Sequence, residues 1–137
     1  MPGTEAYVDT SAFIALRDRS DSYHALFEKL FGNPPPLVTS ALVIAEGHTW
    51  FLRRYNTERA FQFLDLIRRL GTMLTIQPFD PAELHSAARF ARKFGDQRLT
   101  LADAHGLAIM AERRIQACWS TDRHLSLTGV PLVIGTA

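Results

Sequence analysis

The chain has 137 residues, of which 47% are hydrophobic and 21% are charged, a composition typical of a globular protein with a buried core. Its net charge of +1 by itself neither favours nor excludes binding to nucleic acid. No apolar run approaches the roughly 18–20 residues that cross a bilayer, and the start, MPGTEAYV, lacks the pattern of a signal peptide. We therefore expect one domain over residues 1–137 that acts in the cytoplasm and has no membrane partner.

The first half of the chain alternates short apolar strands with helices. The pattern predicts a strand over 5–9 and, after the proline loop NPPPLV, a second strand over 36–40. Helices are predicted between and after these strands, over 12–18, 21–31, 41–55 and from a Thr57 cap to about Leu70.

The second half continues the alternation. It predicts strands over 73–79, 116–121 and 131–135, and helices over 80–94 and 101–114. The clearest helix start is Asp80 at the N-cap, with Pro81 at the first helical position and Glu83 two residues later. Short apolar strands that alternate with helices predict an α/β layered fold with a mainly parallel sheet.

Four acids stand where such folds keep functional groups. Asp9 and Asp122 each follow an apolar strand, and the carboxyl ends of parallel strands meet at one edge of the sheet. Asp103 lies in the first turn of a predicted helix near that edge. Glu46 lies in a helical stretch that is apolar on nearly every side, where a lone charge is costly to bury. Gly47 beside it costs about 1 kcal/mol relative to alanine, which a close backbone or ligand approach would explain.

Each acid also has a purely structural interpretation. Asp9 and Asp122 can cap the helices that follow them, and Thr100 with Asp103 forms the capping-box pattern T-x-x-D. Glu46 can pair with Arg53 or Arg54 on the same predicted helix. These interpretations do not exclude a shared site, because a carboxylate in the first turn of a helix can still bind a metal.

Convergent carboxylates favour a hard cation. Oxygen ligands without cysteine and without an organised set of histidines suit Mg²⁺, or Mn²⁺ as the alternative, rather than Zn²⁺. A cation relieves the repulsion between the acids, and such ions can activate water for phosphodiester hydrolysis. The sequence has neither G-x-x-x-x-G-K-[ST] nor G-x-G-x-x-G, the usual nucleotide-phosphate motifs.

At this point the chain resembles PIN-domain proteins, and most closely the VapC-like toxin ribonucleases of toxin–antitoxin pairs. The matching pieces, in the order and spacing of the family, are VDTSAFIAL, TSALVIAE, DQRLTLADAHGLAIMAE and STDRHL. The resemblance implies a PIN-like three-layer α/β/α fold and a Mg²⁺-dependent endoribonuclease that acts as a toxin. It also implies an RNA substrate, a cognate antitoxin protein and a homodimer.

The resemblance also assigns residues. The acidic site of the family falls on Asp9, Glu46, Asp103 and Asp122. Asp9 and Asp103 would be the main Mg²⁺ ligands, Glu46 a ligand or a base that orients water, and Asp122 a further ligand, often through water. Four further positions would support these acids: Thr10, Ser11, Thr121 and Asp96. Asp96 would lie at the rim of the site.

Other charged residues carry weaker signals. Thirteen of the cations are arginines, and pairs such as Arg53–Arg54 can contact phosphate or form a solvated helix face. His124 is the one histidine near a motif, and we expect it to be a polar surface residue.

Two rival functions remain open. One is a catalytically silent PIN-like module that binds nucleic acid or a protein, against which the intact set of acids argues. The other is a phosphohydrolase of small molecules, which a deep closed pocket would favour over an open groove flanked by arginines.

Overall fold

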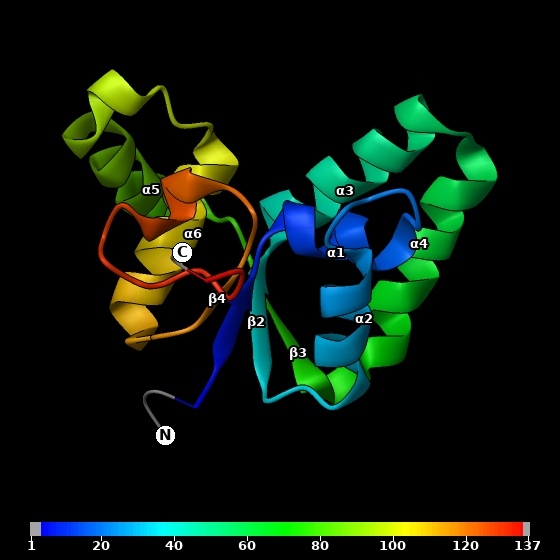
Figure 1. Ribbon diagram of the computed structural model, residues 1–137. Coiled ribbons are helices and arrows are strands. Elements are labelled where there is room, and N and C mark those ends of the chain that lie inside the picture. The colour runs from blue at the N-terminus through cyan, green and yellow to red at the C-terminus, as the bar shows by residue number, and fades with distance from the viewer. Residues whose placement is uncertain (1–3, 136–137) are drawn as a thin grey trace.

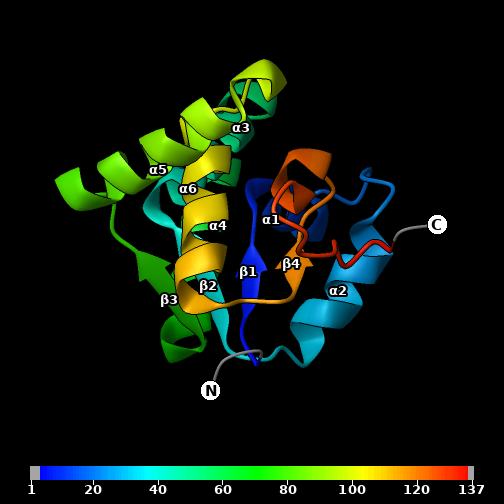
Figure 2. The same cartoon turned by 90° about the vertical axis from the view of Figure 1, so that its left-hand side faces the viewer.

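A parallel sheet forms the centre of the computed structural model, which describes residues 4–135. Within these residues the strand order is β3-β2-β1-β4, and every pairing is parallel. The strands point the same way, so their carboxyl ends share one edge of the sheet (Figure 2). Their bounds are β1 Ala6–Val8, β2 Leu37–Ser40, β3 Leu74–Gln77 and β4 Cys118–Trp119.

Helices cover both faces of this sheet (Figure 1). On one side lie α1 Thr10–Arg17, α2 His24–Gly32 and α4 Thr57–Leu70. On the other lie α5 Pro81–Lys93 and α6 Leu101–Arg113. Helix α3, Ala41–Arg54, starts at the end of β2, packs along α4 and also contacts α6. The predicted three-layer α/β/α fold is confirmed. None of these helices has the length and apolarity that a membrane crossing requires.

The alternation along β1 explains the two halves of the core. Ala6 and Val8 face α1 to α4 and pack in a cluster that includes Phe13, Phe51 and Phe63. Tyr7, between them in sequence, faces the other way, toward residues of α6 such as Leu107 and Met110. Because helices cover both faces, the strand is apolar at every position, as expected for a buried parallel sheet.

The predicted last strand over 131–135 is wrong. In this segment the structure has a single bridge, between Leu132 and Cys118. The chain turns within the segment, where the Gly135 N–H donates to the Leu132 carbonyl at 3.1 Å, and Gly135 has a positive φ; too little extended backbone remains for a longer ladder. A second correction concerns α4: its N-cap is Asn56, whose side chain accepts from the Arg59 backbone N–H, and not Thr57.

Helix α5 begins as predicted, and a buried histidine ties it to the sheet. The Asp80 side chain accepts from the Glu83 backbone N–H at 2.9 Å. The Glu83 carboxylate lies 2.8 Å from Nε2 of His105 on α6, and Nδ1 of His105 lies 2.6 Å from the hydroxyl of Ser40 at the end of β2. His105 is fully buried, so this chain of contacts joins α5, α6 and β2. It holds the start of α6 beside the carboxyl end of the sheet.

Gly47 lies at the crossing of α3 and α4. A Cβ atom at this position would lie 2.5 Å from the ring of Phe63, which is buried and stacks on Phe51. The neighbour is therefore a side chain of the adjacent helix, and not the backbone or ligand that the sequence led us to expect. The absence of a side chain lets the two helices pack closely.

We predict that Gly47→Ala lowers the free energy of unfolding by about 1–3 kcal/mol, because the added methyl group must displace a packed ring. Gly32→Ala is the matched control: a Cβ there meets nothing within 4 Å, so its effect should be neutral or stabilising by up to about 1 kcal/mol. Urea unfolding followed by circular dichroism measures both. Equal stability of Gly47→Ala and the wild type would contradict the proposed contact.

Candidate metal centre

Asp9 is a buried carboxylate held by hydroxyl groups. It follows β1 directly and is only 6% exposed. Its Oδ2 accepts hydrogen bonds from Ser11 at 3.0 Å and from Ser120 at 2.8 Å. It occupies the N-cap position of α1, but its side chain makes no capping hydrogen bond. The side chain is therefore held at the carboxyl edge of the sheet rather than committed to the helix.

Burial controls the ionisation of Asp9. It raises the pKa of Asp9 from its ordinary value of 3.8 to about 6. Hydrogen bonds from Ser120 and Ser11 oppose this rise, and the negative charge of Asp103 adds to it. Asp9 and Asp103, which are far apart in the sequence, therefore interact electrostatically, although α1 and α6 lie on opposite faces of the sheet (Figure 1).

Asp103 and Asp122 meet at a histidine. The Asp103 Oδ2 lies 3.5 Å from Nδ1 of His124, and the Asp122 Oδ1 lies 3.4 Å from the same nitrogen. One ligand atom from each of these three residues falls within 4.8 Å of the others, a spacing that could hold a metal ion. Burial raises the pKa of Asp103, and the charge of Asp122 raises it further.

The same acids also serve as helix caps. Thr100 and Asp103 form the complete capping box of α6, with the Asp103 backbone N–H donating to the Thr100 hydroxyl at 3.1 Å. Asp122 accepts from the His124 backbone N–H at 2.9 Å and caps the 3-10 turn Arg123–Ser126. Both structural interpretations are confirmed, and both residues still present carboxylate oxygens to the cluster.

Glu46 differs from its expected environment. The side chain is exposed, so the expectation that it lies in a fully apolar surrounding is wrong. The reason is that α3 packs on α4 through another side, the one that contains Gly47, and leaves Glu46 facing open space. Its Oε1 accepts from the Thr10 hydroxyl at 2.6 Å. Within the described residues its hydrogen-bond partner is Thr10, and neither Arg53 nor Arg54 pairs with it.

One cavity of about 280 Å³ collects the four acids. Its other lining residues include Thr10 and Ser11, so these two hydroxyl positions lie at the site as well. Thr121 contributes its backbone N–H, which donates to Ser11 at 3.0 Å. Asp96 is exposed on the turn Gly95–Gln97 and does not line the cavity. The acids that line it are Asp9, Glu46, Asp103 and Asp122.

This donor set fits a hard divalent cation. Burial is the main cause that raises the pKa of Asp9 and Asp103, and a neighbouring carboxylate adds to the rise in each case; a cation would remove that repulsion. Carboxylate oxygens are the ligands that Mg²⁺ and Mn²⁺ prefer, and His124 adds one nitrogen. The arrangement can therefore bind a cation beside Asp9 and Glu46.

Nearly the whole chain matches one family of known proteins. The profile of the PIN domain covers residues 6–130. The chain belongs to the PIN domain family. Among its relatives, the 23S rRNA-specific endonuclease VapC20 of Mycobacterium tuberculosis is 27% identical over 124 residues, 90% of this chain and 93% of the relative. Ribonuclease VapC26 of the same organism is 30% identical over 118 residues, 85% of either chain.

Solved structures share the fold of this PIN domain. The crystal structure of VapC20, described as a Sarcin-Ricin loop cleaving toxin, has a TM-score of 0.81 and 25% identity, covering 91% of this chain and 95% of that one. A toxin-antitoxin complex from Klebsiella pneumoniae has a TM-score of 0.61 at 19% identity, covering 93% and 95%. The resemblance to VapC-like proteins is confirmed.

Two residues of this PIN-domain site were not predicted from the sequence. Ser120 bonds Asp9 because the register of β1 and β4 pairs Val8 with Trp119 and places the next residues side by side. His124 was expected on the surface but lies within reach of two acids. The motif STDRHL contains both residues and indicates the short helix after Asp122, but it specifies neither the register of β1 and β4 nor the acids that the His124 ring meets.

We predict that Asp9→Asn stabilises the protein at neutral pH in the absence of metal. A carboxyl group whose pKa is higher in the folded protein than in the unfolded chain loses stability as pH rises, here between about 4 and 6. The rise in the pKa of Asp9 from 3.8 to about 6 corresponds to about 3 kcal/mol of folding free energy. The variant should therefore be more stable than the wild type by about 1–3 kcal/mol at pH 7.5 and similar to it near pH 4.

Urea unfolding in EDTA at pH 4, 5, 6 and 7.5 measures this difference. Asp65→Asn, an exposed acid on α4, is the control and should show no such pH dependence. A variant that is less stable than the wild type at pH 7.5 would contradict the assignment of Asp9 as a buried carboxyl group whose ionisation destabilises the folded protein.

Proposed function

We propose that this protein is a Mg²⁺-dependent endoribonuclease, with Mn²⁺ as the alternative cation, that acts as the toxin of a toxin–antitoxin pair. The observation that carries the proposal is the cavity lined by four carboxylates from separate segments of the chain. Its relatives named as an rRNA-specific endonuclease and a ribonuclease support RNA as the substrate. We propose that one domain over residues 1–137 carries this activity, in the cytoplasm.

We propose distinct roles for the acids. Asp9 and Asp103 would hold the cation, with Asp122 as a further ligand. When bound, the cation would neutralise the carboxylates and lower the pKa of its water. Glu46 is exposed and oriented by Thr10, so it can accept a proton from water or bind the cation.

Other residues would hold these acids in place. Ser11 and the neighbouring Ser120 fix the orientation of the Asp9 carboxylate, and Thr121 fixes Ser11 through its backbone N–H. His124 can donate to either acid beside it, or add a nitrogen ligand. Asp96 would act at the rim, because it is exposed and lies outside the cavity.

The shape of the site favours a polymeric substrate over a small phosphate ester. Glu46 lines both the acidic cavity and a larger neighbouring cavity, so open space extends beyond the acids on the side of α3. Arg53 and Arg54 line that larger cavity and can contact a phosphate backbone.

We predict that the wild type cleaves single-stranded RNA with Mg²⁺ and that EDTA abolishes cleavage. Asp9→Asn should reduce the rate at least about a hundredfold, since removing a cation ligand removes several kcal/mol of transition-state stabilisation. Gel analysis of a labelled RNA measures the rate.

Asp65→Asn is the control for this measurement, because Asp65 is an exposed acid on α4 whose partner is Arg68. It should cleave at the wild-type rate. Cleavage that survives both EDTA and Asp9→Asn would refute the metal site. A folded wild type that binds RNA without cutting it would instead establish a silent nucleic-acid-binding module.

We also propose a cognate antitoxin and a homodimer. The fold is shared with a protein solved in a toxin-antitoxin complex, which supports a protein inhibitor. The edge strand β3 exposes Ile76, and Met73 before it is exposed as well, which supports contact with a second copy.

We predict that induced expression of the wild type in a bacterial host arrests growth, because RNA cleavage without the antitoxin is unopposed. Asp9→Asn expressed from the same vector should allow normal growth. Growth curves and immunoblots measure arrest and protein level. Normal growth with folded wild-type protein present would count against the toxin role.

A further inference from the structure

A second cavity opens beside the acids, and Glu46 is the one carboxylate among its lining residues. Its volume is about 780 Å³, and it lies between α3 and the start of α6. It shares Glu46, Trp50 and Thr100 with the acidic cavity, so the two spaces are adjacent. Sites that enclose small organic groups have volumes of roughly 300–1,000 Å³.

The wall of this cavity is apolar and has one large aromatic side chain. Trp50 is partly buried and packs edge-to-face against Phe51, at 5.0 Å between ring centroids, and Tyr55, at 6.0 Å. These contacts hold the indole ring in place, so the Trp50 side chain loses little conformational entropy when a ligand stacks on it. The apolar side chains around it are Leu42, Ala45, Leu101 and Ala102.

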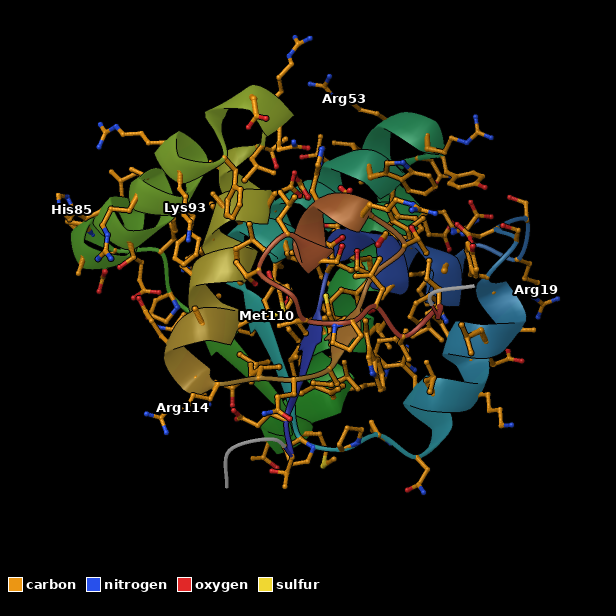
Figure 3. The ribbon with its side chains drawn as sticks, turned by 60° about the vertical axis from the view of Figure 1, so that its left-hand side comes forward. Arg19, Arg53, His85, Lys93, Met110 and Arg114 are labelled. Atoms are coloured by element: carbon orange, nitrogen blue, oxygen red, sulfur yellow. The ribbon has the colours of Figure 1, made fainter. Side chains whose placement is uncertain are left out.

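Two cations border the same cavity. Arg53 and Arg54 follow Trp50 on α3, line the cavity and are exposed. In the described part of the chain neither has a carboxylate within ion-pair distance, so their charge is available to a ligand. Figure 3 shows Arg53 extending from the upper end of the molecule, whereas Arg114 lies at the opposite end.

We propose that this cavity binds a nucleobase of the RNA strand next to the cleaved phosphodiester, by stacking on Trp50, while Arg53 and Arg54 contact the flanking phosphates. The proposal rests on the proposed ribonuclease function. An apolar wall with an aromatic ring suits the face of a base, and unpaired arginines suit the backbone.

Charge argues for this occupant over a second copy of the chain. A twofold contact through the cavity would bring the Arg53–Arg54 pairs of two copies together, and their like charges would repel. A polyanion instead neutralises them. Because the apolar wall offers few donors and acceptors for base edges, we expect stacking with weak sequence preference.

Tryptophan fluorescence tests the proposal without catalysis. The chain has two tryptophans, and Trp119 is buried at 4% exposure, so quenching by a ligand reports on Trp50. In EDTA, a hexamer of adenosine nucleotides should quench the emission. A hexamer of the same ribose phosphate backbone without bases should bind roughly 5–100-fold more weakly and quench little.

Variants at Trp50 give the second measurement. Because these variants lack the reporting indole, their affinity is measured by the fluorescence anisotropy of a dye-labelled hexamer. Trp50→Ala should weaken binding of the adenosine hexamer roughly 5–100-fold and remove its advantage over the base-free hexamer, whereas Trp50→Phe should keep most of it. Phe61→Ala is the matched control, since Phe61 is an aromatic residue of α4 with 58% exposure that does not line the cavity. It should bind both hexamers like the wild type.

Salt dependence tests the arginines. Arg53→Ala should reduce the slope of log affinity against log salt by about 0.7, the value for one phosphate contact on a single strand. Arg114→Ala, at the far end of the molecule, should leave the slope unchanged.

The outcomes separate this proposal from the proposed function. Equal binding of the two hexamers by the wild type overturns the nucleobase site even if RNA is cleaved with Mg²⁺, and this comparison needs no variant that could misfold. Trp50-dependent binding in EDTA supports the site even if cleavage fails. A change from dimer to monomer in Trp50→Phe or Arg53→Ala, measured by light scattering, with unchanged hexamer binding, would assign the cavity to a second copy and overturn the proposal.

Discussion

The central constraint in this structure is that several carboxylates share one small and partly buried space. Burial and mutual repulsion raise the pKa of Asp9 and Asp103. The fold offsets this repulsion with hydroxyl and N–H groups. Ser11 and Ser120 donate to Asp9, and Asp103 and Asp122 lie where the N–H groups of a helix or turn begin. The partial positive charge at these starts stabilises negative charge. A concentration of anions held in this way is suited to a cation.

Close packing below the site keeps its acids in place. The missing side chain of Gly47 lets α3 approach the ring of Phe63, and α3 carries Glu46. Buried His105 joins α6 to β2 and α5, and α6 carries Asp103. Two buried interactions therefore help to set the separation of the helices on either side of the acids. The open space between α3 and α6 follows from the same arrangement, because these helices meet near their starts and not along their lengths.

Residues that cap helices in this protein also belong to the cluster that could hold a metal ion. The carboxylate of Asp103 accepts from the Thr100 backbone N–H at 3.3 Å and still lies in the cluster with His124. Asp122 combines the same two roles. A capping bond fixes where a carboxylate lies but uses only one of its oxygen lone pairs, so the other lone pairs remain available for further partners. The structural and functional interpretations of Asp103 and Asp122 are therefore compatible, whereas the side chain of Asp9 makes no capping bond although it stands at an N-cap.

The sequence by itself determined the alternation of strands and helices, the start of α5 at Asp80 and the identity of the acids, because these depend on local patterns of apolar, capping and charged residues. It did not determine that Glu46 is exposed, that residues 131–135 form only one bridge, or that Ser120 and His124 join the acids. These features depend on strand register and helix packing between residues distant in the chain. Only the tertiary structure decides such pairings, because no local pattern specifies which distant partner a residue meets.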